Sequence, residues 1–217
     1  MIMNIGSYID FSMLRPDGLP KDIDALGKIA VERAFKAICI PPYFVDFANQ
    51  HFSGTPLKIA TVVGFPMGYS STSAKIEEIK KATADGAHEV DAVINVSAVK
   101  SGNWNYVANE IGSMVTACHM RGKMIKVILE AHLLTDAELR KVIEICIEAK
   151  ADFIKNSTGF NGGKADPALI TYLRSLVGDS IKIKASGGIR SLEESVNLIE
   201  AGADRIGSSV ADTFVNN

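Results

Sequence analysis

The sequence predicts an α/β fold in which eight parallel strands alternate with helices, in one domain over residues 1–217. Three observations predict it. Short apolar runs alternate with amphipathic helical stretches from end to end. No linker or low-complexity segment divides the chain, and 217 residues are enough for one eight-unit barrel. Apolar residues make up 47% of the chain, which allows a large buried core.

Eight segments are predicted strands: residues 8–14, 37–40, 59–65, 90–96, 124–130, 153–157, 181–185 and 205–208. A doubly wound open sheet would show the same alternation of strands and helices. The closed alternative is favoured because eight units are present and no GxGxxG sequence follows the first strand. The predicted architecture is therefore a (β/α)8 barrel, the TIM barrel.

The predicted helices carry capping signals. Thr135 and Ser191 each precede a glutamate by three residues, which is the pattern of a capping box. Asp166 stands before Pro167, a pairing typical of a helix start. Gly86 and Gly202 occur where helices are expected to end.

An alanine precedes every second predicted strand, at Ala34, Ala87, Ala151 and Ala203. Counting four residues on from each gives Ile38, Asp91, Lys155 and Gly207. One interior layer of a closed eight-stranded barrel takes its side chains from alternate strands. The repeat therefore predicts that Asp91 and Lys155 point inward from the same layer.

Two lysines, Lys155 and Lys184, are predicted to point into the barrel, because they alternate with apolar residues that suit its outer face. Lysine is almost never buried without a partner. A neutral lysine amine attacks carbonyls, and desolvation with a second cation nearby lowers its pKa. Asp91 would supply the compensating carboxylate and a proton relay. We predict that these three residues are catalytic; the alternatives are structural ion pairs or lysines exposed at strand ends.

A phosphate site is predicted after the last two strands. Gly187 and Gly188 follow the seventh strand, and Ser208 and Ser209 follow Gly207 where a helix is expected to start. Further substrate contacts are expected from Thr158 and Gly159 after the sixth strand, and from Asp10 and Ser12 in the first. The alternative for these residues is an ordinary turn or a strand that is polar at its exposed end.

Other features narrow the class of protein. A formal net charge of -2 predicts no nucleic-acid partner. No apolar run approaches about 18 residues, so no membrane span is expected, and the N-terminal residues lack the pattern of a signal peptide, which predicts a cytoplasmic protein. The three cysteines are scattered and read as core residues. The histidines lack metal-ligand spacing, so no metal site is expected among them.

The segments that carry these residues resemble deoxyribose-phosphate aldolases, a class I family that forms Schiff bases. The resemblance covers nearly the whole chain, in order. The run FIKNSTGF resembles the strand with the covalent lysine, here Lys155. KASGGIR resembles the segment with the second catalytic lysine, Lys184, and EVDAVIN the strand with the catalytic aspartate, Asp91. RIGSS, at residues 205–209, resembles the C-terminal phosphate loop.

The resemblance implies reversible cleavage of 2-deoxy-D-ribose 5-phosphate to D-glyceraldehyde 3-phosphate and acetaldehyde, in deoxyribonucleotide catabolism. It also implies that neither a metal nor an organic cofactor is needed, because the lysine does what a metal ion does in other aldolases. A homodimer or a larger homo-oligomer is a further implication. Two alternatives stay open: another phosphate-binding barrel synthase that uses a Schiff base, and a non-catalytic sugar-phosphate binder. The chain departs from the common family pattern at Phe11, Ser12, Arg15, Pro41 and Asn156. Ser12 keeps a hydroxyl group, and the departures at Pro41 and Asn156, at strand ends near the site, concern substrate affinity more than reaction type.

Overall fold

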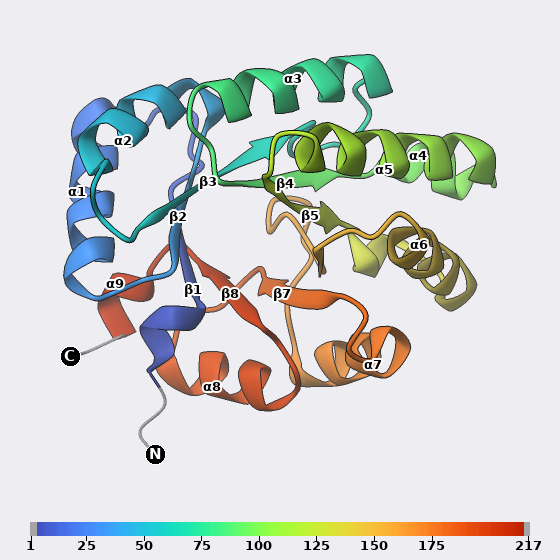
Figure 1. Ribbon diagram of the computed structural model, residues 1–217. Helices are drawn as coiled ribbons and strands as arrows, with labels where there is room; N and C mark the ends of the chain where they lie inside the picture. Colours follow the sequence, from blue (N-terminus) through green and yellow to red (C-terminus); the bar gives the residue numbers. More distant parts are fainter. Residues whose placement is uncertain (1–3, 215–217) are drawn as a thin grey trace.

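The computed structural model describes residues 4–214, which form a closed barrel of parallel strands inside a ring of helices (Figure 1). The strands are β1 (Ile9–Ser12), β2 (Ala37–Ile40), β3 (Lys58–Val63), β4 (Glu89–Val93), β5 (Met124–Ile128), β6 (Phe153–Lys155), β7 (Lys182–Ser186) and β8 (Arg205–Ser208). Each strand pairs in parallel with the next, and β1 pairs with β8. The predicted (β/α)8 barrel is confirmed.

The helices are α1 (Pro20–Glu32), α2 (Val45–Phe52), α3 (Thr72–Ala84), α4 (Val96–Lys100), α5 (Trp104–His119), α6 (Asp136–Glu148), α7 (Pro167–Val177), α8 (Leu192–Glu200) and α9 (Ala211–Phe214). Short 3-10 helices precede β1 and follow β2 and β5; they are η1 (Ile5–Tyr8), η2 (Pro42–Phe44) and η3 (Ala131–Leu133). The capping boxes at Thr135 and Ser191 are formed, and the Asp166 side chain caps α7. None of the helices within residues 4–214 is long and apolar enough to cross a membrane.

Several strands end earlier than the sequence predicts, because side chains replace the backbone pairing there. β4 ends at Val93, and the side chain of Asn95 caps α4 by accepting a hydrogen bond from the Ala98 N–H. β6 ends at Lys155, after which the Asn156 amide bonds both the N–H and the carbonyl of Ser186. The eighth strand is different: it continues through Ser208, so the prediction of a helix start at residues 207–209 is wrong.

The alanine repeat is correct in three units and shifted by one residue in the first. Ala87, Ala151 and Ala203 each donate a backbone hydrogen bond to the carbonyl five residues earlier. Each of them follows a residue with positive φ that ends a helix. In the first unit the residue with positive φ is Ala34 itself, and Phe35 makes the equivalent bond, to Ala30.

Four residues on from Phe35 is Cys39, so the expectation of Ile38 at the inward position is wrong. Cys39 packs inside the barrel with three small or branched side chains, Ala37, Ala60 and Val62. Ile38 instead belongs to the larger core between the strands and the helices. The residue type alone could not reveal this shift, since an alanine stands beside the true equivalent position.

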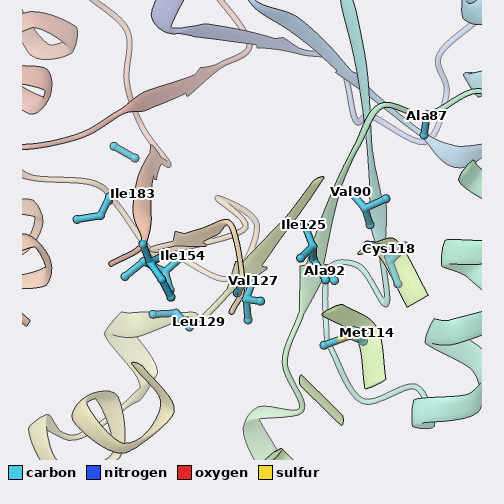
Figure 2. Close-up of a cluster of buried hydrophobic side chains, with 14 of the residues drawn as sticks. Ala87, Val90, Ala92, Met114, Cys118, Ile125, Val127, Leu129, Ile154 and Ile183 are labelled. Atoms are coloured by element: carbon cyan, nitrogen blue, oxygen red, sulfur yellow. The ribbon is translucent and has the colours of Figure 1, made fainter. Parts of the chain in front are cut away.

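The main apolar core lies between the barrel and its helices, and Figure 2 shows part of it. Outward-facing strand residues meet the inner faces of the helices there, among them Val90, Ala92, Met114, Cys118, Ile125, Val127, Ile154 and Ile183. All of these side chains are buried. Each large one contributes about 1.5–3 kcal/mol when removed from water. Because this outer core stabilises the fold, the interior of the barrel can hold charged groups.

Candidate active site

A cavity of about 580 Å³ opens at the carboxyl ends of β1, β6, β7 and β8. Active sites of (β/α)8 enzymes lie at this end. The predicted site residues in its lining are Ser12, Lys155, Thr158, Gly159, Lys184, Gly187, Gly188, Ser208 and Ser209. Asp10 and Asp91 are fully buried and do not belong to the lining. A larger groove of about 850 Å³ lies between α1 and α2. The charged residues in its lining are all exposed or half-buried, so it holds no buried ionisable group.

Asp91 is the centre of a buried ion cluster beneath the cavity. Its Oδ2 atom lies 3.0 Å from Lys155 Nζ and 2.8 Å from Lys184 Nζ. Lys155 and Lys184 pair directly across β6 and β7, so neighbouring strands deliver the two amines side by side. Both lysines are at most 3% exposed. The structure thus brings together the three residues that the sequence predicts to be catalytic.

A second tier of charges lies below. Asp10 pairs with Lys184 at 2.5 Å and with Arg205 at 2.5 Å. Lys126 Nζ lies 2.9 Å from Asp91 Oδ1 and 2.5 Å from Glu89 Oε2, and Arg205 also reaches Glu89. Asp10 was expected to contact substrate hydroxyl groups. In the structure, the Asp10 carboxylate instead forms ion pairs with Lys184 and Arg205 below the cavity, because a fully buried carboxylate needs such partners.

The charges of this cluster balance when Lys155 is neutral. Four basic groups (Lys126, Lys155, Lys184 and Arg205) face three acidic groups (Asp10, Glu89 and Asp91). Burial lowers the pKa of Lys155, and the charge of Lys184 lowers it further, against the opposing pull of Asp91. Of the two amines that line the cavity, Lys155 is therefore the one that gives up its proton more readily.

The neighbours of Lys155 stay charged. Burial by itself lowers the pKa of Lys184, but Asp10 and Asp91 outweigh it and hold that pKa above its ordinary value. Burial favours the neutral form of Asp91, but Lys126, Lys184 and Lys155 hold its pKa well below the usual range. Burial and the charge of Asp91 raise the pKa of the Cys39 thiol to about 11, which leaves it protonated and a poor nucleophile at neutral pH.

The cavity wall formed by the loops after β7 and β8 suits an anion. The backbone N–H groups of Gly188, Ile189 and Ser209 donate no hydrogen bond to any residue between 4 and 214. Gly187 has a φ of 104°, and a Cβ there would collide with the carbonyl oxygen of Gly163. The Ser208 hydroxyl is already engaged, since it donates to the Ile189 carbonyl and accepts from the Val210 N–H. The free N–H donors on this wall therefore belong to loops rather than to the start of a helix.

The sequence reasoning missed Lys126, Glu89 and Arg205, although the signal was present. Each of them shares its strand with outward-facing apolar residues in the same alternating pattern that identified Lys155. The four histidines are exposed or half-buried. Within residues 4–214, no group of three or more His, Cys, Asp or Glu side chains is arranged to hold a metal ion.

Comparison with known proteins shows the family to which the chain belongs. Residues 8–211 match the DeoC/LacD family of aldolases. A protein of Desulfitobacterium hafniense (strain DSM 10664 / DCB-2), named deoxyribose-phosphate aldolase, is 46% identical over 207 residues, which cover 95% of each chain. A solved aldolase called QR15 has a TM-score of 0.93 at 39% identity, over 99% of this chain and 95% of its own.

A deoxyribose phosphate aldolase from Aeropyrum pernix, described as a tetramer, has a TM-score of 0.91 at 31% identity over 97% of this chain and 89% of its own. The match therefore extends from the sequence of residues 8–211 to the arrangement of the whole barrel. The chain belongs to the DeoC/LacD family of aldolases.

Proposed function

We propose that the chain catalyses the reversible cleavage of 2-deoxy-D-ribose 5-phosphate to D-glyceraldehyde 3-phosphate and acetaldehyde. The observation that carries the proposal is a buried lysine, Lys155, that lines a cavity and whose loss of a proton balances the charges around it. The names of the relatives at 42–46% identity support the substrate. The cavity wall with free backbone N–H groups supports binding of its phosphate.

In the proposed reaction, the neutral amine of Lys155 attacks the C1 aldehyde and forms a carbinolamine. Loss of water gives an iminium, and Lys184 is the acid that donates a proton to the departing hydroxyl, because it is protonated and lines the cavity. A base then removes the proton of the C3 hydroxyl, through a water molecule. The C2–C3 bond breaks, and its electron pair moves to the iminium nitrogen and leaves an enamine.

The enamine is protonated at C2, and water releases acetaldehyde and the free lysine. Asp91 lies between Lys155 and Lys184 and does not line the cavity, so its proposed role is to pass protons between the two amines and to hold them in place. Gly187, Gly188 and Ser209 are the proposed phosphate contacts, with Ser208 fixing their loops, while Ser12, Thr158 and Gly159 face the sugar. The iminium is the electron sink, so this scheme uses no metal ion.

Trapping of the Schiff base tests the proposal. The protein is treated with deoxyribose 5-phosphate and sodium borohydride, and the modified peptide is identified by mass spectrometry. We expect a reduced adduct on Lys155 and none in Lys155→Met. A coupled assay measures the release of glyceraldehyde 3-phosphate, and this activity should be lost in Lys155→Met. A protein that binds the sugar phosphate but stays unmodified would be the non-catalytic binder.

We further propose a cytoplasmic homo-oligomer that binds small molecules and no nucleic acid. The free cysteines suit a reducing compartment, and the net charge is -2. The tetrameric description of the Aeropyrum pernix relative supports an oligomer. Sedimentation velocity measures the state directly.

A further inference from the structure

Glu130, which follows β5, has an unusual environment for a carboxylate. It is 1% exposed and adopts the left-handed backbone conformation, with φ 50° and ψ 52°. Within residues 4–214 it forms no ion pair. A buried charge without a cation and a non-glycine residue in this conformation each cost free energy. The fold tolerates both costs at one position, which indicates that the carboxylate has a specific task.

Both carboxylate oxygens bind one loop. Glu130 Oε1 accepts a hydrogen bond from the Thr158 N–H, and Oε2 accepts one from Asn161 Nδ2 at 2.9 Å. The two partners belong to the segment between β6 and α7, residues 156–166, here called the β6–α7 loop. Thr158, Gly159 and Phe160 of this loop line the cavity. The carboxylate therefore anchors a wall of the active site without facing the cavity itself.

The anchored loop also supports the predicted phosphate contacts. Ala165 N–H donates a hydrogen bond to the Gly187 carbonyl at 3.0 Å. The Gly163 carbonyl oxygen lies so close to Gly187 that a Cβ on Gly187 would collide with it. The loop also contacts the residues after β3, because the Phe160 ring packs edge-on against the Phe65 ring with their centroids 5.1 Å apart. Loss of the Glu130 anchor would therefore move Gly187 as well as Thr158.

We propose that Glu130 is a positioning residue that fixes the β6–α7 loop, and through it the phosphate-binding Gly187, for substrate binding. The inference rests on the proposed function. It predicts an effect on substrate affinity rather than on the chemical step, because Glu130 touches neither Lys155 nor Asp91. It also predicts a larger effect on the phosphorylated sugar than on free deoxyribose.

Glu130→Gln tests the proposal, because a glutamine keeps the shape but presents an NH2 group to one of two donors. We expect KM for deoxyribose 5-phosphate to rise about tenfold, with kcat changed less than twofold. KM for free deoxyribose should rise less. Asn161→Asp alone should also raise KM, since it puts two carboxylates together. In the double variant, the introduced glutamine can donate to the introduced carboxylate, so KM should fall below that of either single variant.

Glu78→Gln is the matched control. Glu78 also accepts a backbone hydrogen bond, from the Gly64 N–H, but lies outside the cavity lining, so the KM of this variant should stay unchanged. An unchanged KM in Glu130→Gln, or a double variant worse than both single ones, would overturn the positioning role. An equal rise in KM for deoxyribose 5-phosphate and for free deoxyribose would also overturn the positioning role. Borohydride trapping on wild-type Lys155 is measured in parallel, so that failure of the proposed function is recognised separately.

Discussion

Lys155 and Lys184 lie opposite each other on adjacent strands and share Asp91, yet their pKa values shift in opposite directions. The difference arises from the second carboxylate. Lys184 pairs with Asp10 as well as Asp91, whereas Asp91 is the only ion-pair partner of Lys155 between residues 4 and 214. One residue type can thus provide both the proposed nucleophile and the proposed acid, because the strand register gives the two amines different neighbours.

Lys184→Met should slow turnover and move the pH dependence of Schiff-base formation to higher pH. Lys184 lowers the pKa of Lys155, so its removal raises that pKa and leaves less neutral amine at a given pH. Asp91 also loses a competing cation and holds the Lys155 ammonium more tightly, which acts in the same direction. Loss of the acid should reduce kcat by about 10²- to 10⁴-fold. The rate of adduct trapping across pH measures the shift.

Lys182→Met is the matched control on the same strand. Lys182 is exposed and lies over the Phe153 ring at 5.7 Å, at the opposite end of the barrel from the cavity. Its loss should leave both the rate and the pH profile unchanged. A profile that stays in place in Lys184→Met would mean that Lys184 does not tune Lys155.

Single residues were predictable wherever strand alternation applied. Alternation identified Lys155, Lys184 and Asp91 as neighbours inside the barrel, and the contacts agree. It could not separate a residue that lines the cavity from one beneath it, as for Asp10, because depth depends on strand tilt and register. Glu130 closed the predicted strand 124–130, but alternation could not reveal its contacts, because they are made to a loop 28 residues away in sequence.

Helices α1, α3, α6 and α8 end in the same way, with one residue of positive φ before the next strand. Two of these residues are glycines, Gly86 and Gly202, and two are not, Ala34 and Lys150. The glycines were predictable as helix ends. The shared geometry was not, because an alanine or a lysine gives no sequence signal for a left-handed turn.

Lys150→Gly should stabilise the protein by about 0.5–1 kcal/mol. A side chain in the left-handed region costs about 1–2 kcal/mol, and glycine gives back part of this as chain entropy in the unfolded state. Lys150 is exposed at the end of α6 and far from the cavity lining, so activity should not change. Urea denaturation at neutral pH measures the free energy of unfolding.

The same substitution in the interior of the same helix serves as its control. Lys141 is exposed within α6, and Lys141→Gly should destabilise the protein by about 1 kcal/mol. Opposite signs for the two variants would attribute the gain to backbone conformation. A loss of stability in both would show that the turn at Lys150 does not carry the expected strain.

At the scale of the whole molecule, apolar packing and charge are separated by the barrel wall. The large core lies outside the strands, where Figure 2 shows aliphatic side chains, and the ion cluster lies within them. Alternation in each strand predicts this separation, and closure of the sheet turns it into an inside and an outside. The contact between the β6–α7 loop and the loop that follows β7 could not be predicted. It includes a backbone hydrogen bond from Ala165 to Gly187, and backbone groups give no sequence signal.

Because the proposed phosphate cradle is built from the loops after β7 and β8, which the closed barrel holds together, an anion bound there should stabilise the entire fold. Inorganic phosphate at a hundred times its Kd would add about 2.7 kcal/mol to the free energy of unfolding. For a chain of this size, 1 kcal/mol corresponds to about 2–4 °C in Tm, so a rise of about 5–10 °C is expected.

Gly188→Asp places a carboxylate at the cradle, at a position with φ 78° that aspartate tolerates better than most residues. Phosphate also stabilises proteins by exclusion from their surfaces, and this part of the rise should remain in the variant. The difference between wild type and variant, measured by calorimetry in phosphate and in sodium chloride of equal ionic strength, isolates the specific part. If the two proteins respond equally to phosphate, the loops after β7 and β8 are not its binding site.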